Sequence, residues 1–203
     1  VVEGDVLVSS NGLISVGTGS VGTTASDAHR FIIRGNFTNN GDVRFTNLAA
    51  ANYFNYPGDR VDVVFDEDYA DQSVLINGLT RFYRIEIDKG SDQTFILNID
   101  ASAPNLFYLF GSNDIMGVTP VPDAPNINNL NALGLMTGTV RLGANITIPS
   151  LAEEWTEGDL NYHVDEDACL WIDGANVTHT SNAGGGTSNS FVLYGKLRIT
   201  NPS

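Results

Sequence analysis

The chain consists of short apolar runs separated by turn residues, and this pattern constrains its fold more than any other feature of the sequence. The stretch RFYRIEIDKGSDQTFILNID (81–100) shows it best, with two apolar and polar alternations on either side of a turn at 89–92. A period of two is typical of half-buried β-strands, because successive side chains point to opposite faces. No segment of ten or more residues has helical periodicity, so the sequence predicts an all-β fold.

The short runs recur at a loose interval along the chain. Six apolar landmarks follow one another at similar spacings: Val8, Ile33, Val63, Ile87, Leu109 and Leu135. An average spacing of roughly 25 residues fits one coil of a solenoid with three short strands per coil. We therefore expect a right-handed parallel β-helix (β-solenoid) of short strands. A β-sandwich is the alternative, with longer strands spaced by about 8–12 residues.

In such a solenoid each coil points a row of apolar side chains inward, while Gly, Asn and Asp turn the corners in left-handed backbone conformations. The 203 residues predict one module over 1–203, interrupted by a Pro-rich insertion near 117–129. The chain opens with VVEGDVLVSS and ends with KLRITNPS. We therefore expect a fragment of a longer chain, whose adjacent domains cover the strand edges at both ends.

The composition argues against some classes of partner. The net charge is −14, with 24 acidic and 10 basic residues, whereas nucleic acids and anionic membranes bind clusters of Lys and Arg. No run of about 18 apolar residues predicts a membrane-spanning helix. The single cysteine, Cys169, lies in an apolar run and is expected to be a buried structural thiol.

Two segments carry a family resemblance: VVFDEDYADQSVLINGLTRFYRIEIDKGSDQTFILNIDAS (63–102) and LGLMTGTVRLGANITI (133–148). They resemble the β-helical repeat regions of large secreted and cell-surface proteins of Bacteroidota. Those regions run as a Phe-containing strand, a "fyxLxIdk" strand, a turn, a "tvxL" strand and "LxLxsGtvxLg". Here Phe65, 82–89, 94–97 and 133–143 hold these places. The resemblance implies a secreted or cell-surface location and a repeat architecture that is often adhesive, and it implies no catalytic site.

Two acidic stretches are candidate calcium sites. Asp66–Asp71 places four carboxylates in six residues, and Asp165-Glu166-Asp167 follows His163 closely. Ca²⁺ takes six to eight oxygen ligands. The candidate ligands are Asp66, Asp68, Asp71, Asp165 and Asp167. The alternative is that both stretches are solvated acidic turns that hold no ion.

Three aromatic residues are candidates for stacking on a sugar ring. Trp155 stands among glutamates, and Tyr53 and Tyr56 lie in an irregular aromatic segment. The alternative is that these rings pack against the core.

Three functions remain open at this point. The sequence favours a structural or adhesive module of an extracellular or cell-surface bacterial protein, without catalysis of its own and with a glycan or surface protein as partner. A β-helix polysaccharide lyase or glycoside hydrolase is an alternative, which Asp66–Asp71 and Asp165–Asp167 would favour if they met in one groove. A carbohydrate-binding module is the third, and it would be built on a sandwich.

Overall fold

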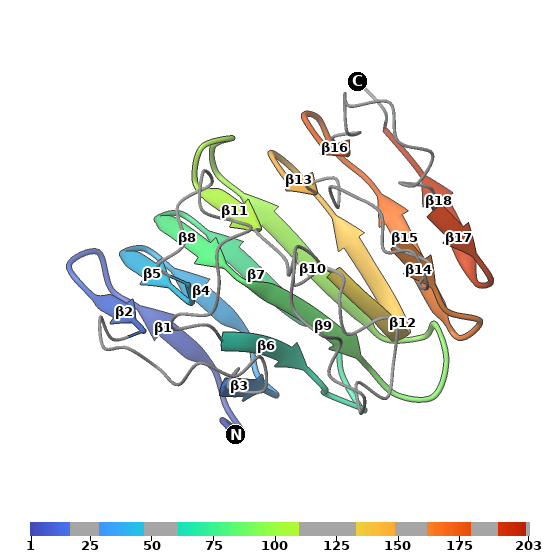
Figure 1. Cartoon of the computed structure of the whole chain (residues 1–203), viewed down its shortest axis with the longest axis horizontal. Coiled ribbons are helices and arrows are strands. Elements are labelled where there is room, and N and C mark those ends of the chain that lie inside the picture. Colours follow the sequence, from blue (N-terminus) through green and yellow to red (C-terminus); the bar gives the residue numbers. More distant parts are fainter. Residues whose placement is uncertain (17–28, 47–60, 110–132, 149–161, 180–190, 202–203) are drawn as a thin grey trace, which may run out of the picture.

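The described part of the chain contains β-strands and no helix (Figure 1). The computed structural model describes residues 1–16, 29–46, 61–109, 133–148, 162–179 and 191–201. Every strand pair in these ranges is parallel. The all-β prediction is confirmed, and the parallel pairing is compatible with a β-solenoid.

The strands form three rows, where a row is a set of strands that pair side by side along the molecule. The chain runs through rows one, two and three in the same order each time, and one such circuit is called a pass here. Row one contains β3 (His29–Ile33), β6 (Val61–Phe65), β9 (Arg84–Asp88), the first half of β12 (Leu133–Leu142), β14 (Tyr162–Val164) and β17 (Phe191–Leu193). Row two contains β1 (Val6–Val8), β4 (Phe37–Asn39), β7 (Gln72–Ile76), β10 (Ile96–Ala101), the second half of β12, β15 (Ala168–Ile172) and β18 (Lys196–Ile199). Row three contains β2 (Leu13–Ser15), β5 (Asp42–Arg44), β8 (Leu79–Phe82) and β11 (Phe107–Leu109), followed by the pair β13 (Thr147–Ile148) and β16 (Thr178–His179).

Strand β12 connects row one to row two. Its first half pairs with β9 and β14, and its second half pairs with β10 and β15. The strand changes rows at Gly138, where φ is +82° and an added Cβ would lie 2.7 Å from the Cβ of Lys89. Rows one and two are therefore two sides of a single 12-stranded sheet.

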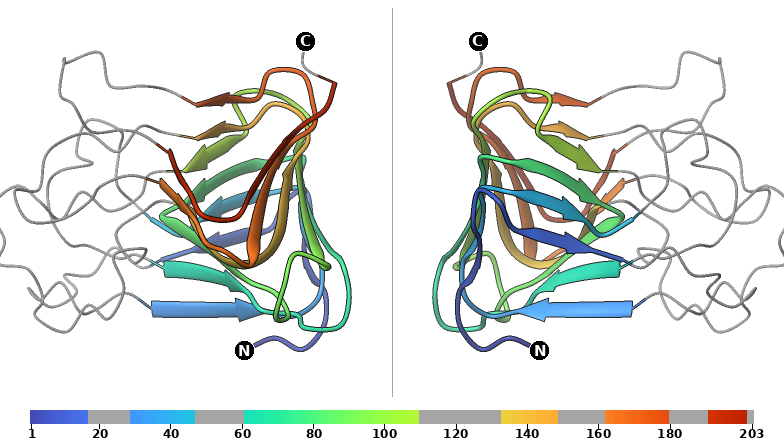
Figure 2. Two further views of the ribbon diagram at one scale, coloured as in Figure 1. Left: turned by 90° about the vertical axis from the view of Figure 1, so that its right-hand side faces the viewer. Right: turned by 90° about the vertical axis from the view of Figure 1, so that its left-hand side faces the viewer.

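The interior is built from ladders of apolar residues that pair strand by strand along the molecule. One ladder in row two joins Val6, Phe37, Val74, Ile99, Leu142, Ile172 and Ile199. One ladder in row one joins Ile33, Phe65, Ile87, Leu135, Val164 and Leu193. Seen along the long axis, the rows enclose a shared interior (Figure 2). Phe37, Phe45, Phe82 and Phe107 pack there with ring centroids 5.7–6.3 Å apart.

The corner between rows two and three uses the residues that the sequence predicts for corners. Asn145, Asn176 and Asn201 have φ angles of 59°, 60° and 50°. They follow β12, β15 and β18, and the Nδ2 of Asn176 donates to the Oδ1 of Asn145 at 3.1 Å. Gly41 and Gly78 stack so closely that a Cβ at Gly78 would lie 2.1 Å from the carbonyl oxygen of Gly41.

The loose interval between the apolar landmarks is not the spacing between paired strands. Val63 pairs with Ile85, whereas Ile85 pairs with Leu133, which lies more than twice as far along the chain. The landmarks Val8 and Leu109 lie in rows two and three, while the other four lie in row one. The reason is that the segments joining row three to row one differ in length. The predicted Pro-rich insertion near 117–129 lies outside the described residues.

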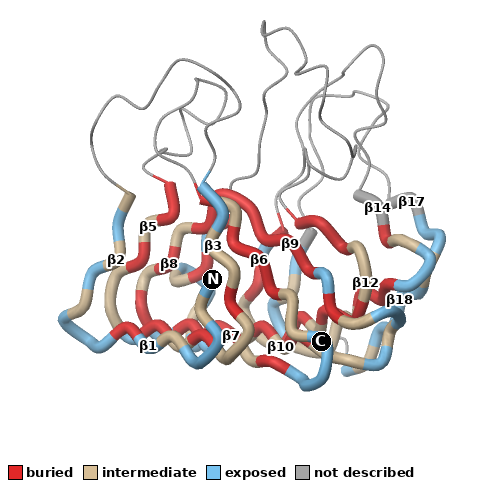
Figure 3. Tube along the Cα trace, turned by 90° about the horizontal axis from the view of Figure 1, so that it is seen from below, coloured by how far each residue is buried: buried red, intermediate tan, exposed pale blue. Residues whose placement is uncertain are grey.

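Burial is highest in the middle of the molecule, and exposed residues gather at both ends, around β1 and β2 and around β17 and β18 (Figure 3). Among the described residues there is no helix with the length and apolar character needed to cross a membrane.

We expect inward and outward residues of row two to differ sharply in their contribution to stability. Ile99 is fully buried, whereas Leu75 on the outer face is 41% exposed. Ile99→Ala should lower the free energy of unfolding by about 2–5 kcal/mol, because it leaves a cavity in the core. Leu75→Ala should lower it by about 1 kcal/mol or less. Urea unfolding of both variants measures the difference, and equal losses would contradict the assignment of the two faces.

Candidate functional site

The corner between rows one and two contains both acidic stretches that the sequence singles out. On successive passes this corner is formed by 34–36, 66–71, 89–95, 136–138, 165–167 and 194–195. Asp66–Asp71 therefore follows β6, and Asp165-Glu166-Asp167 follows β14. The fold thus places both candidate calcium-binding stretches at the same corner.

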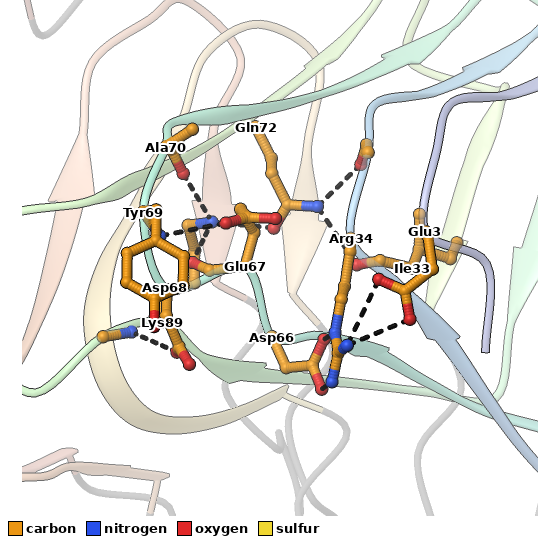
Figure 4. Close-up of polar contacts among 12 residues, drawn as sticks. Glu3, Ile33, Arg34, Asp66, Glu67, Asp68, Tyr69, Ala70, Gln72 and Lys89 are labelled. Carbon is orange, nitrogen blue, oxygen red and sulfur yellow. Dashed lines mark hydrogen bonds and ion pairs between the residues drawn. The ribbon is translucent and has the colours of Figure 1, made fainter.

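The stretch Asp66–Asp71 encloses the side chain of Lys89, which arrives from the next pass (Figure 4). Lys89 is fully buried, although the sequence predicts it as a turn residue. Its Nζ donates to the carbonyl oxygens of Glu67 and Ala70 at 3.0 Å each and to Oε1 of Gln72 at 2.7 Å. Three oxygens that face into the stretch are therefore bonded to an ammonium group of the protein itself.

Gln72 extends this hydrogen-bonded group to a third pass. Its Nε2 donates to the carbonyl oxygens of Ile33 at 3.1 Å and Gly35 at 2.6 Å, at the corner after β3. The buried Gln72 amide thus accepts a hydrogen bond from Lys89 on the following pass and donates hydrogen bonds to carbonyl oxygens on the preceding pass. Because buried polar groups are costly when unpaired, Lys89 and Gln72 together satisfy backbone carbonyls that the parallel ladders leave free at this corner.

The carboxylates of the stretch also have partners in the fold. Asp66 accepts from the Nε of Arg34 at 3.1 Å, and Arg34 in turn pairs with Glu3 at 3.0 Å. The Oδ1 atoms of Asp68 and Asp71 accept from the backbone N–H groups of Gly90 at 3.0 Å and Ile96 at 2.8 Å. These contacts tie the stretch to the passes on either side of it.

Burial and the neighbouring carboxylates shift the pKa of Lys89 in opposite directions. Desolvation disfavours the ammonium form, while Glu67, Asp71, Asp68 and Asp66 favour it. Desolvation is the larger effect and lowers the pKa of Lys89 from 10.5 to about 8. The group is therefore mostly protonated at neutral pH and titrates just above it.

The second acidic stretch lies on the same corner but at a distance from the first. Two other passes, at 89–95 and 136–138, separate Asp66–Asp71 from Asp165–Asp167. With parallel strands spaced by about 4.8 Å, three steps place the two stretches about 14 Å apart. Within the described ranges, no three His, Cys, Asp or Glu side chains are grouped to hold one metal ion. The two stretches therefore do not meet in one groove. A shared groove is the arrangement that would have favoured the lyase or hydrolase alternative.

The predicted stacking residues lie outside the described residues, since Tyr53 and Tyr56 belong to 47–60 and Trp155 to 149–161. The flanking strands still define where these segments join the fold. The segment 47–60 follows β5 of row three and precedes β6 of row one. The segment 149–161 follows β13 and precedes β14, which is the same step between rows.

The sequence reasoning missed a polar stack on the outer face of row two. Trp171 pairs with Arg141 on one side and Arg198 on the other. The two guanidinium carbons lie 5.4 Å and 3.9 Å from the centroid of the indole ring, which is a cation–π arrangement. The alternation in ACLWI contained this signal, because Leu170 and Ile172 face inward and their neighbours therefore face outward.

Asp173 and Cys169 lie close to this stack, and the pKa of each is shifted. The Thr200 hydroxyl and the Arg141 guanidinium hold the pKa of Asp173 at about 2, and Arg141 Nε lies 2.7 Å from its carboxylate. Cys169 is buried, as predicted, and its burial raises the pKa of the thiol. A thiol with a raised pKa is a poor nucleophile at neutral pH, which fits a structural role.

We expect Lys89 to make stability depend on pH between about 8 and 10.5. In this window the unfolded chain binds a proton at Lys89 that the folded chain has lost, so the free energy of unfolding should rise with pH, by up to about 3 kcal/mol. Below pH 8 both states are protonated and the contribution is flat. Urea unfolding across this range, with Lys89→Gln as a control that cannot ionise, measures the effect. Identical slopes for the two proteins would mean that Lys89 has its ordinary pKa.

Whether the acidic stretch Asp66–Asp71 binds calcium or is an ion-free turn stays open from the sequence, and isosteric variants can decide between the two. Asn can still accept the backbone hydrogen bonds made by Asp68 and Asp71, but it removes their charge. Because the neighbouring carbonyls already bind Lys89, we expect millimolar Ca²⁺ to change the melting temperature of wild type and of Asp68→Asn/Asp71→Asn equally, relative to EDTA. A rise seen in wild type and absent from the variant would instead assign a calcium ion to this stretch.

The chain was compared with models of known protein families, with curated proteins and with solved structures, and none of them matches it. The likeness to surface repeats of Bacteroidota therefore stays a prediction from the residues quoted above. The function has to be inferred from the geometry of the chain itself.

Proposed function

We propose that the chain is a structural and adhesive module of an extracellular or cell-surface bacterial protein, built as a right-handed parallel β-solenoid. Its role is to hold binding segments on a rigid rod and to present them to a glycan or a protein on another surface. It has no catalytic activity of its own in this proposal. The location rests on the resemblance in sequence and on the acidic composition.

The solenoid is supported by the order of the strands. Each pass runs through rows one, two and three, and each strand pairs in parallel with the corresponding strands of neighbouring passes. Connections between parallel strands of one sheet are right-handed in nearly all proteins, because of the twist of the strands. The right-handed form is the expectation from this rule, and an experimental structure tests it.

The adhesive role rests on one observation, which is where the longer connections join the rod. Five longer segments separate described strands: 17–28, 47–60, 110–132, 149–161 and 180–190. Each of them follows a strand of row three or of the β13–β16 pair and precedes a strand of row one. In solenoid proteins, insertions that recur at one edge often form the binding face. Two of the five carry the candidate stacking residues Tyr53, Tyr56 and Trp155.

The corner between rows one and two has the opposite character. Its segments are short, and their polar groups are bonded to neighbouring passes, as the contacts of Lys89 and Asp66 illustrate. Such a corner contributes to stability and leaves ligand contacts to the opposite edge of the rod.

We expect the purified chain to bind a subset of immobilised extracellular polysaccharides without changing their length. Trp155→Ala and Tyr53→Ala/Tyr56→Ala should weaken binding about tenfold, the effect expected from the loss of an aromatic stacking contact. A glycan array followed by titration of the positive ligands measures this. Chromatography of the polymer after incubation tests for cleavage.

Tyr69→Ala is the matched control, because Tyr69 is 86% exposed and lies at the other edge of the rod. It should bind like wild type. Binding to no polysaccharide and no cell-surface protein would contradict the adhesive role. Shortening of the polymer by the wild-type chain would favour the lyase or hydrolase alternative.

A further inference from the structure

The outward face of row three carries polar side chains on four neighbouring strands. Ser15, Arg44, Arg81 and Tyr108 pair in turn across β2, β5, β8 and β11, and we call this set the row-three strip (Figure 1). Val43, next to Arg44, is fully buried and faces the core, so Arg44 and its ladder partners face outward. Strands that adjoin a sheet pair with its edges, so neighbours at either end of the rod leave this face uncovered.

Two guanidinium groups of the strip share a single carboxylate. The Nε of Arg44 donates to Oδ2 of Asp42 at 2.9 Å, and Nη2 of Arg44 donates to the same oxygen. The Nη1 of Arg81 lies 3.5 Å from the other oxygen, Oδ1, which accepts no hydrogen bond from the described residues. Arg81 is therefore held near Asp42 by charge, and its guanidinium keeps hydrogen-bond donors for another partner. The side chains of Arg44 and Arg81 are 43% and 30% exposed.

Other arginines of the described ranges have more carboxylates around them. Arg34 pairs with Glu3 and Asp66, Arg141 pairs with Asp100 and Asp173, and Arg30 and Arg84 share Asp62 and Glu86. The outward face of row three thus has an excess of positive charge in a chain of net charge −14. Exposed charges farther away than about 8 Å are largely screened at physiological salt, so the local excess governs what binds here.

The row-three strip lies beside the edge to which the longer segments are attached. The segments 47–60 and 110–132 follow β5 and β11. Strand β8, between them in the sheet, differs because the single residue Tyr83 separates it from β9. Arg81 therefore lies on a pass without a long segment of its own, between two passes that have one. This places its guanidinium next to the edge proposed for ligand binding.

We propose that the row-three strip binds the carboxylate groups of an acidic polysaccharide, with the guanidinium of Arg81 as the main contact. This inference rests on the adhesive function proposed above and names its ligand class. Asp42 shows which chemical group fits, because a carboxylate already lies between the two guanidinium groups. A guanidinium binds a planar carboxylate through two parallel hydrogen bonds. Tyr108, beside Arg81 and 42% exposed, provides an aromatic surface for the sugar ring.

Polygalacturonate, with a carboxylate on each sugar, and its methyl ester, with none, are the probes for a titration of the purified chain. Wild type should bind polygalacturonate at least about tenfold more tightly than the ester, and added NaCl should reduce the difference. Arg81→Gln should weaken binding of polygalacturonate about tenfold. Asp42→Asn should tighten it about threefold, because it removes the competing carboxylate while an oxygen remains for Arg44.

Arg198→Gln is the matched control, because it removes the same charge from an exposed position on the outward face of row two. It should bind polygalacturonate like wild type. Arg81→Gln leaves the pair of Asp42 and Arg44 in place, so it should also unfold in urea like wild type. Should Arg81→Gln unfold instead, the gain expected from Asp42→Asn decides, and unchanged or weaker binding by Asp42→Asn would count against the proposal.

Equal binding of polygalacturonate and its ester by wild type, or an unchanged affinity in a folded Arg81→Gln, would overturn the proposal. Dextran sulfate bound through Arg81 more tightly than polygalacturonate would overturn the assignment to carboxylates. The adhesive function fails separately. Neutral glycans that bind through Trp155, Tyr53 or Tyr56 without a contribution from Arg81 would leave that function in place and remove only the acidic ligand.

Discussion

The structure depends on one constraint, which is that every strand satisfies its backbone on strands from other passes of the chain. Parallel neighbours cannot be joined by a tight hairpin, so each strand pairs with residues of another pass, as Val63 does with Ile85. Inward positions therefore need mostly apolar residues, because each inward side chain is covered by its paired residues on the strands above and below it. Phe37 and Ile99 belong to one ladder, although they lie far apart in the sequence, and both are fully buried.

The same constraint leaves the connections between passes free to vary. The step from row three to row one spans few residues between β8 and β9, and many between β11 and β12. The free energy needed to close a loop grows slowly with its length, so both steps are compatible with the same ladders. Such segments can change in length and composition without disturbing the core, and for this reason the proposed binding role is assigned to them.

The alternation of apolar and polar residues was enough to predict most strands and their inward faces. Leu97 and Ile99 are examples, since both lie in the predicted stretch 81–100 and both face inward on β10. Register could not be predicted in this way. The local pattern predicts which residues face inward, but it does not predict which distant residue pairs with each of them on the neighbouring strand. The loose interval between the apolar landmarks was an average over passes of unequal length.

The candidate site shows a second limit of local pattern. Lys89-Gly90-Ser91-Asp92 was expected to be a turn, and the backbone agrees, since Gly90 has a φ of +66°. The side chain of Lys89 nevertheless points inward, because the carbonyls of the preceding pass need donors there. A six-residue acidic stretch has the same composition whether it surrounds Ca²⁺ or an ammonium group. The residue that distinguishes the two, Lys89, lies three strands beyond Asp71 in the chain and reaches the stretch through the fold.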